Sequence, residues 1–265
     1  MLIIGERINS TRAPVQKAIK ARNAAFIVKE AKGQCAAGAT ILDINCAMGL
    51  DDEVQDIDWV ISVVHSEMPS AGISIDSPNY RAIERALVVY KGTGDVFINS
   101  ITADDAKMSR ILPLALKYNA KLIALTMDEG SMPRTKLERR DIAKKIVTRV
   151  KEMGFDETRL YFDPLIRPLA TEPEQAEEFL SSIGLIKELG PVKTICGLSN
   201  ISFGLPKRSV INSVYLSLAR ARGIDAALID PLDKNVMSAL FASEALLGSD
   251  LYCKNYIKAF REGKL

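Results

Sequence analysis

The segment 39–46 reads Ala-Thr-Ile-Leu-Asp-Ile-Asn-Cys, a short apolar and β-branched run that ends in polar residues. Such a run is typical of a buried strand that breaks into a loop. Eight segments of the chain have this character: Leu2–Asn9, Ala39–Cys46, Gly72–Ser77, Asp95–Ile101, Lys121–Met127, Arg159–Leu165, Lys193–Asn200 and Ala226–Pro231. Their first residues lie 23 to 38 positions apart, so every gap has room for a helix.

The gaps show helical periodicity. Between residues 79 and 90, apolar residues stand at positions 83, 86, 87 and 90, on one face of a helix, and Arg81, Glu84 and Arg85 fall on the other face. Similar patterns predict helical segments over 14–33, 53–67, 104–119, 136–153, 173–189, 207–222 and 234–247. A last segment, 251–262, is expected to form a short C-terminal amphipathic helix.

This alternation decides the fold class. Strands separated by helices pair in parallel through right-handed crossovers, and eight such units can close without leaving a sheet edge. We therefore predict a (β/α)8 TIM barrel, an α/β fold, as a single domain over residues 1–265. An open doubly wound sheet is the alternative, but the residues from Gly5 to Asn9 lack the glycine fingerprint of a dinucleotide site.

The composition of the chain excludes several classes of function. The 35 Lys and Arg nearly balance the 33 Asp and Glu, which gives a net charge of +2 and no basic footprint for nucleic acid. The chain has no run of 18 apolar residues, and its start turns polar too early for a signal peptide, so we expect a cytoplasmic protein that does not enter a membrane. The four cysteines match no metal-binding spacing and are expected as free thiols.

Polar residues end almost every predicted strand. In barrels of this class the chemistry lies at the carboxyl ends of the strands. If Ile41 points into the barrel, Asp43 and Asn45 do so as well, and Tyr161 and Asp163 likewise share a face. The strand ends carry Glu6 and Asn9, Asp43 and Asn45, Asp76, Asn99, Thr126 and Asp128, Asp163, Ser199 and Asn200, and Asp230. For any single one of them, capping of the next helix or an Asx turn is the alternative interpretation.

A ring of carboxylates and amides suits a flat ligand with several donors and acceptors. A pterin has such an edge, since its N3–H and 2-amino group form a fork that one carboxylate accepts. Other chemistries fit less well. Lys121 and Lys193 stand at the wrong strand ends for a Schiff base, and the single His65, on a helix, is expected to pack rather than to bind zinc. A glycosidase would lack an aromatic platform, because Trp59 also lies on a helix.

Seven short motifs lie in order on these strands, and an eighth lies in the C-terminal segment: Leu2-Ile3-Ile4-Gly5-Glu6-Arg7-Ile8-Asn9, Leu42-Asp43-Ile44-Asn45, Ile75-Asp76-Ser77, Ile98-Asn99-Ser100, Leu125-Thr126-Met127, Tyr161-Phe162-Asp163-Pro164-Leu165, Gly197-Leu198-Ser199-Asn200 and Leu251-Tyr252-Cys253. With them the chain resembles the methyltetrahydrofolate:corrinoid protein methyltransferases. These are pterin-binding barrels related to the folate domain of cobalamin-dependent methionine synthase and, more distantly, to dihydropteroate synthase. The resemblance runs nearly end to end.

The resemblance implies a role for each matching residue. Asp76, Asn99 and Asp163 would hold the pterin ring, with Asp43 in the same network. Asn200 would hydrogen-bond near N5, the atom that carries the methyl group, while Gly197 and Ser199 line the site and Arg208 contacts the substrate. Because N5 is a poor leaving group, we expect a hydrogen-bond network around Asn200, with Asp76 and Asp163, to assist it rather than one dedicated acid. No tightly bound metal is expected.

The resemblance also implies the other participants. The methyl group would move between methyltetrahydrofolate and the cobalt of a corrinoid (cobalamin) carried by a separate protein that docks at the carboxyl end of the barrel. The family suggests a homodimer, and the sequence does not fix the direction of transfer, the identity of the corrinoid partner or the number of glutamates on the folate. The alternatives are a dihydropteroate synthase-like enzyme, whose basic run is missing after Gly197, and a pterin-binding protein without activity.

Overall fold

Eight parallel strands close into a barrel in which each strand pairs with the next along the chain and β8 pairs with β1. The computed structural model describes residues 1–47, 52–128 and 132–265. The strands are β1 Leu2–Asn9, β2 Ile41–Asn45, β3 Gly72–Asp76, β4 Val96–Ile101, β5 Lys121–Leu125, β6 Leu160–Asp163, β7 Lys193–Gly197 and β8 Ala226–Ile229. The predicted (β/α)8 barrel is confirmed.

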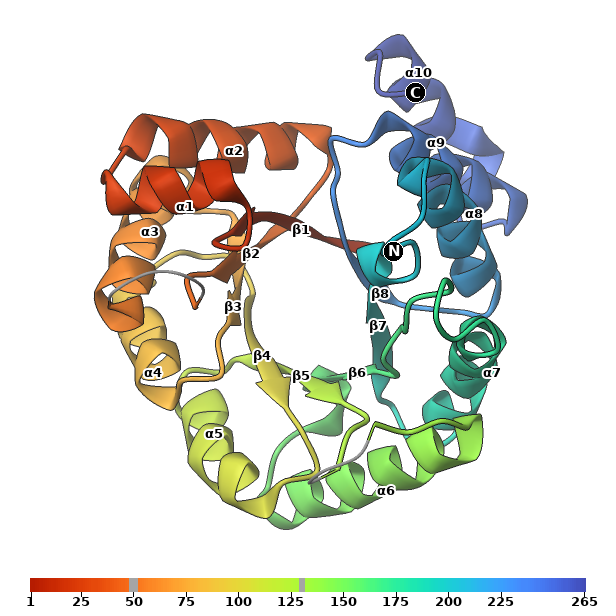
Figure 1. Ribbon diagram of the computed structural model, residues 1–265, viewed down its shortest axis with the longest axis horizontal. Helices are drawn as coiled ribbons and strands as arrows, with labels where there is room; N and C mark the ends of the chain where they lie inside the picture. Colours follow the sequence, from red (N-terminus) through yellow and green to blue (C-terminus); the bar gives the residue numbers. More distant parts are fainter. Residues whose placement is uncertain (48–51, 129–131) are drawn as a thin grey trace.

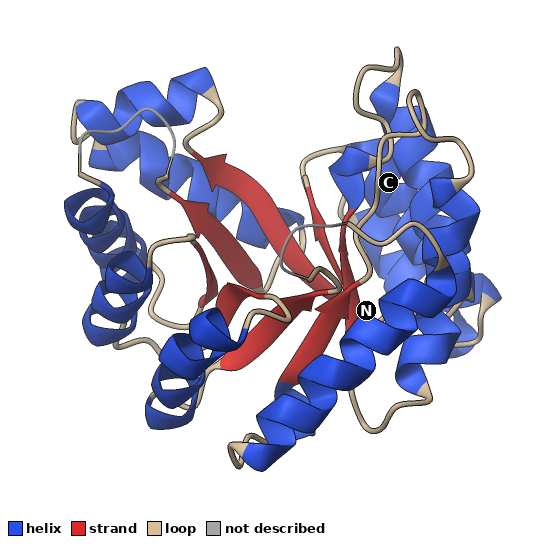
Figure 2. Cartoon of the chain, turned by 60° about the horizontal axis from the view of Figure 1, so that its bottom comes forward, coloured by secondary structure: helices blue, strands red, loops and turns tan. Residues whose placement is uncertain are grey.

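The helices form a ring outside the strands (Figure 1), and the turned view shows the strands enclosed between them (Figure 2). They are α1 Ala13–Lys20, α2 Ala24–Ala37, α3 Glu53–Glu67, α4 Tyr80–Val89, α5 Asp105–Lys117, α6 Lys136–Glu152, α7 Gln175–Lys187, α8 Arg208–Ala221, α9 Lys234–Leu246 and α10 Lys254–Arg261. The short C-terminal helix α10 is confirmed and lies outside the ring, against α9. Within the described residues no helix has the length and apolar character to cross a membrane.

Side-chain parity divides the core into two layers. Ile41, Phe97 and Tyr161 belong to a small apolar cluster inside the barrel, where the rings of Phe97 and Tyr161 meet edge to face with centroids 5.0 Å apart. Leu42 and Ile44, the neighbours of Ile41 on the other side of β2, pack instead among the helices. The inward direction predicted for Ile41 is therefore confirmed, and the interior positions two residues further along each strand face the mouth of the barrel.

The structure differs from the prediction at the first helical segment. Residues 14–33 form parts of two helices, α1 and α2, rather than one. Arg22 has a left-handed backbone conformation with φ +50°, and the side chain of Asn23 accepts a hydrogen bond from the Phe26 amide to cap α2. An asparagine cap inside an apolar pattern ends one helix and starts the next without interrupting the periodicity.

The seventh strand is also shorter than predicted. It ends at Gly197, and residues Leu198–Asn200 form a 3-10 turn that leads into the loop before α8. This turn takes Ser199 and Asn200 out of the sheet, to a cavity that Glu6 also lines. All four cysteines are free, and His65 packs on α3 with its ring centroid 5.8 Å from that of Tyr90.

Candidate active site

A layer of polar side chains stands directly above the apolar interior of the barrel. Glu6, Asp43, Asn99 and Asp163 each lie two residues beyond an interior apolar residue, which is Ile4, Ile41, Phe97 or Tyr161. Because side chains two apart on a strand point the same way, all four face the barrel axis. The strand order places these four residues on β1, β2, β4 and β6 of one closed sheet, so the carboxyl end of the barrel is lined by carboxylates and amides.

Asp76, at the end of β3, also belongs to this polar layer, and its charge acts on Asp43, which Asn99 contacts by a hydrogen bond. Ser74 Oγ donates to Asp43 Oδ1 at 2.6 Å, and Asn99 Nδ2 donates to the same oxygen at 3.3 Å. Asn45 Nδ2 donates to Asp76 Oδ2 at 2.9 Å. Burial, and for Asp43 also the nearby Asp76 carboxylate, raises the pKa of both carboxyls, and that of Asp43 is held well above its ordinary value. The two carboxyls therefore hold a proton more readily than exposed ones would.

Asp163 is held by main-chain donors. The Leu165 amide donates to Asp163 Oδ1 at 2.8 Å, and the Gly197 amide donates to the same carboxylate. Burial raises the pKa of Asp163 to about 6, although these two amides and the positive charge of Arg139 work in the opposite direction. Asp163 is therefore mainly ionised at neutral pH, with its neighbours arranged to stabilise the charge.

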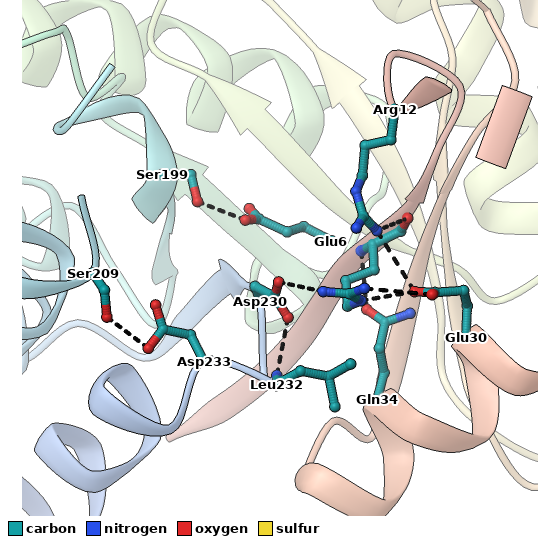
Figure 3. Close-up of polar contacts among 10 residues, drawn as sticks. Glu6, Arg12, Glu30, Gln34, Ser199, Ser209, Asp230, Leu232 and Asp233 are labelled. Carbon is teal, nitrogen blue, oxygen red and sulfur yellow. Dashed lines mark hydrogen bonds and ion pairs between the residues drawn. The ribbon is translucent and has the colours of Figure 1, made fainter. Parts of the chain in front are cut away.

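The turn after β7 connects to β1 through Glu6. Ser199 Oγ donates to Glu6 Oε1 at 2.5 Å (Figure 3), and burial raises the pKa of Glu6 to about 6. Asn200 is exposed, and its Nδ2 lies only 3.2 Å from the point where a β-carbon on Gly197 would stand. A residue without a side chain at position 197 thus leaves Asn200 room to lie back over the mouth of the barrel.

A polar cavity of about 410 Å³ opens beside this turn. Its wall consists of Glu6, Arg7, Asn9, Thr11, Arg12, Ser199, Asn200, Arg208 and Asp230. Arg208 bridges the turn, since its Nη2 donates to the Ser199 carbonyl at 2.6 Å and its Nε to Ser202 Oγ at 3.0 Å. A larger cavity of about 620 Å³ lies outside the barrel against α5 and α6, and none of the polar layer lines it.

Some polar strand ends serve the fold instead. Asp230 Oδ2 accepts from Arg7 Nη1 at 2.6 Å and its Oδ1 accepts from the Leu232 amide at 2.9 Å, while Arg7 Nε also binds Glu30 at 2.7 Å (Figure 3). These contacts make Asp230 a structural residue at the edge of the cavity, in line with the turn interpretation of its Asp-Pro sequence. Within the described residues, no three His, Cys, Asp or Glu side chains come together in an arrangement able to hold a metal ion.

The residues predicted to bind the substrate cover most of this polar set, but they do not include three contributors, two of which, Glu6 and Asn45, stand among the predicted polar strand ends. Asn45 and Ser74 hold the carboxylates of Asp76 and Asp43, and Glu6 holds the turn that carries Asn200. The sequence indicates an inward direction for Glu6, because Glu6 stands two residues after Ile4, which lies on the inner face of β1. No comparable signal pointed to Ser74, a serine in the middle of a strand.

The barrel and its polar mouth define a class of proteins. The family model described as pterin binding enzyme matches residues 5–230, and the chain belongs to this family. It is 34% identical to the methylcorrinoid:tetrahydrofolate methyltransferase of Eubacterium limosum, over all of this chain and 98% of that protein. It is also 31% and 28% identical to the methionine synthases of Mycobacterium tuberculosis and Mycobacterium leprae, over 86% of this chain but only 20% of each of those proteins.

Solved structures show the same fold at lower identity. A dihydropteroate synthase from Yersinia pestis in complex with a sulfonamide drug superposes with a TM-score of 0.73, at 14% identity and over 94% of both chains. One from Xanthomonas albilineans with 4-aminobenzoic acid gives 0.71, at 18% identity and over 94% of this chain and 92% of that one. At such identities these likenesses concern the fold alone.

Proposed function

We propose that this protein transfers a methyl group between N5 of a tetrahydrofolate and the cobalt of a corrinoid carried by a separate protein. The observation that carries the proposal is the ring of partly buried carboxylates and amides at the mouth of the barrel, in a chain that matches a methylcorrinoid:tetrahydrofolate methyltransferase from end to end. The corrinoid supplies a cobalt centre that accepts or gives up the methyl group. The residues of this chain bind and orient the folate.

The polar layer would hold the pterin ring by its edge. Asp163 is the carboxylate suited to the fork formed by N3–H and the 2-amino group, because it lies near a positive charge and is ionised at neutral pH. Asp76 and Asn99 would take the remaining ring atoms, and Asp43 would orient Asn99 through their hydrogen bond. The apolar interior beneath this layer excludes water from the buried edge of the ring.

The turn after β7 would place a hydrogen-bond donor near N5 of the folate. This nitrogen leaves more easily if it receives a hydrogen bond or a proton as its bond to the methyl group breaks, and an amide such as Asn200 gives a bond that strengthens as charge develops. Gly197 leaves space for that amide, and Ser199 fixes the turn through Glu6. The Arg208 side chain donates to the Ser199 carbonyl of the same turn and would face the substrate from the cavity wall.

The carboxyl end of the barrel is the proposed docking face for the corrinoid protein. Three loops that follow strands each present a large apolar side chain to solvent there, namely Met132, Phe203 and Leu232, with Phe203 66% exposed. Close approach of cobalt to the methyl group requires a partner to cover this end. Exposed apolar side chains around a site are typical of a surface that another protein covers.

A second surface supports a homodimer. Val210, Val214 and Leu218 stand at i, i+4 and i+8 of α8, and all three are about half exposed. Such a stripe on the outside of a barrel is unfavourable in water unless a partner covers it. We propose that a second copy of this chain packs against α8.

The experiment that tests the proposed function combines the purified protein with methyltetrahydrofolate and reduced cobalamin, and follows the cobalt absorption spectrum. The reverse mixture contains methylcobalamin and tetrahydrofolate. We expect conversion in at least one direction, faster than in buffer. Conversion in neither direction, with free or protein-bound corrinoid, would refute the proposal. Formation of dihydropteroate from p-aminobenzoate and a dihydropterin pyrophosphate would instead establish the synthase alternative.

A further inference from the structure

Arg139, in the first turn of α6, is the largest of the fully buried side chains. It lies behind the loop that follows β6, outside the polar layer described above. A guanidinium group stays charged under all ordinary conditions, and removing it from water is costly unless its N–H groups find acceptors. Its burial therefore needs a structural or functional reason.

The acceptors of Arg139 are all neutral. Its Nε donates to the Pro164 carbonyl at 2.6 Å, its Nη2 to Gln175 Oε1 at 2.8 Å, and its Nη1 to the Arg134 carbonyl at 3.2 Å. None of the ion pairs among the described residues includes this guanidinium. The hydrogen bonds are thus satisfied, but the charge is not neutralised, and its field reaches the groups around it.

The positive charge of Arg139 acts on the carboxylate of Asp163. Pro164 and Leu165 follow Asp163 directly, and Leu165 has a left-handed conformation, φ +65°, that a leucine rarely adopts. This conformation lets the Leu165 amide donate to Asp163 Oδ1. Arg139 holds the carbonyl oxygens of both residues, that of Leu165 at 3.5 Å, so it stabilises the loop in the shape that cradles the carboxylate.

The ionisable groups that face Asp163 and Arg139 come from several elements. Asp163 is faced by Arg139 from α6, by the Cys196 thiol from β7, and by the main-chain amides of Leu165 and Gly197. The ionisable groups around Arg139 are Glu178 on α7, Arg167 in the loop before it, Tyr215 on α8, and Glu138 on its own helix. Among the groups of the described chain that act on Asp163, Arg139 is therefore the one cation.

We propose that Arg139 is a positioning residue for Asp163, which fixes the loop around this carboxylate and places a positive charge behind that loop, so that the carboxylate can bind the donor edge of a pterin. The inference rests on the proposed function, since it assigns Arg139 a part in substrate binding. It predicts that Arg139 affects the pH dependence of binding, which a purely structural arginine would leave unchanged.

The test measures the dissociation constant of methyltetrahydrofolate by calorimetry between pH 5 and pH 8. For the wild-type protein, affinity should fall as the pH drops through about 6, where Asp163 takes up a proton. In Arg139→Met the midpoint should move to higher pH, and a shift of about one pH unit would make the affinity about threefold weaker near pH 6.5, with a smaller loss at pH 8. Arg139→Lys, which keeps the charge, should retain the wild-type midpoint.

A milder variant keeps the test decisive if Arg139→Met does not fold. Gln175→Glu places a carboxylate on the partner of Nη2 and neutralises the guanidinium in place, so the midpoint should again rise. The matched control is Arg159→Met. Arg159 also donates to two main-chain carbonyls, those of Ala115 at 3.1 Å and Ala120 at 2.5 Å, but at the opposite end of β6. It should lower stability without moving the midpoint.

The outcomes separate the two proposals. A folded Arg139→Met or Gln175→Glu protein with the wild-type midpoint would overturn the role of Arg139 while leaving the proposed function intact. A wild-type protein that binds no methyltetrahydrofolate at any pH would overturn the proposed function, and this inference with it.

Discussion

Replacing Asp163 by asparagine should make the protein more stable and a poorer binder at the same time. Burial raises the pKa of Asp163 from an ordinary 3.8 to about 6. A folded-state pKa above the unfolded value means that the fold disfavours the ionised carboxyl. With about 1.4 kcal/mol for each tenfold change in proton affinity, ionisation of Asp163 costs the fold roughly 3 kcal/mol at neutral pH. Since this residue is partly exposed at the mouth, that figure is an upper bound.

The dependence on pH follows from the sign of this shift. The cost is fully present above about pH 6, decreases as the pH falls, and disappears below about pH 4, where the carboxyl is protonated in both states. An asparagine carries no charge and keeps one oxygen that can accept from the Leu165 amide, but its amide nitrogen cannot accept from the Gly197 amide, so the gain is smaller than the full cost of the charge. Asp163→Asn should therefore raise the free energy of unfolding at pH 7 by up to about 3 kcal/mol, with the gain vanishing near pH 4.

Binding should change in the opposite direction. The amide nitrogen that Asp163→Asn introduces would present a donor to a ligand edge that also consists of donors. A hydrogen bond to a charged group contributes about 1.5 to 3 kcal/mol, so the affinity for methyltetrahydrofolate at pH 7 should fall about 10- to 150-fold.

Two measurements check this prediction, urea unfolding at pH 4 and pH 7 and calorimetric titration with methyltetrahydrofolate at pH 7. The control is Asp156→Asn, which changes an exposed cap of Thr158 at the other end of β6 and should neither stabilise the fold nor alter binding. A stability difference for Asp163→Asn that is negative at pH 7, or the same at both pH values, would refute the assigned cost of the buried carboxylate. Unchanged affinity would refute its role in binding.

Three further predictions concern other parts of the molecule. Asn200→Ala should lower kcat/KM for methyl transfer roughly 100- to 1000-fold, as expected for one donor at a site of developing charge, and a loss below about threefold in stopped-flow assays would contradict this role. Gly197→Ala brings a β-carbon to 3.2 Å from Asn200 Nδ2. It should displace that amide and so reduce kcat/KM for methyl transfer, while the thermal unfolding temperature changes little. An unchanged kcat/KM would show that the amide has room to move. Val214→Glu should shift the mass in light scattering from a dimer to a monomer, and a wild-type protein that is already monomeric would refute the proposed interface.

The barrel was predictable from the sequence because the period of its strands is regular and does not depend on tertiary contacts. Each apolar run ends in a polar residue, and the parity of Ile41 was enough to direct Asp43 inward. The helix and strand boundaries that were predicted wrongly lie where a single residue determines the local backbone conformation. Asn23 splits a continuous helical pattern by capping α2, and Gly197 ends β7 before the turn that carries Asn200.

The candidate site was predictable only in part, for a related reason. Carboxylates and amides at strand ends are visible in one sequence, but the partners that tune them come from elsewhere in the chain. Ser74 meets Asp43 across a strand pair, and Ser199 meets Glu6 across a separation of 193 residues. Arg139 is the clearest case, since a basic residue in the first turn of a helix looks exposed until the loop after β6 covers it.

The carboxyl groups at the mouth of the barrel lower the stability of the fold. Glu6, Asp43, Asp76 and Asp163 all have pKa values raised mainly by burial, so each ionised carboxyl opposes folding at neutral pH. A ligand whose edge donates hydrogen bonds to these groups would offset that cost. Methyltetrahydrofolate should accordingly raise the melting temperature more than p-aminobenzoylglutamate, which lacks the pterin edge.

One measurement tests the role of the polar layer as a whole. It compares the rate of cobalamin methylation by methyltetrahydrofolate between the wild-type protein and the double variant Asp76→Asn/Asp163→Asn. If this layer holds the folate for methyl transfer, the wild-type protein should methylate cobalt well above the rate in buffer. The double variant, which loses two carboxyl contacts, should be slower by roughly 100-fold or more. Equal rates for a folded double variant and the wild type, or a wild-type rate no higher than that of buffer, would contradict a role of the polar layer in methyl transfer.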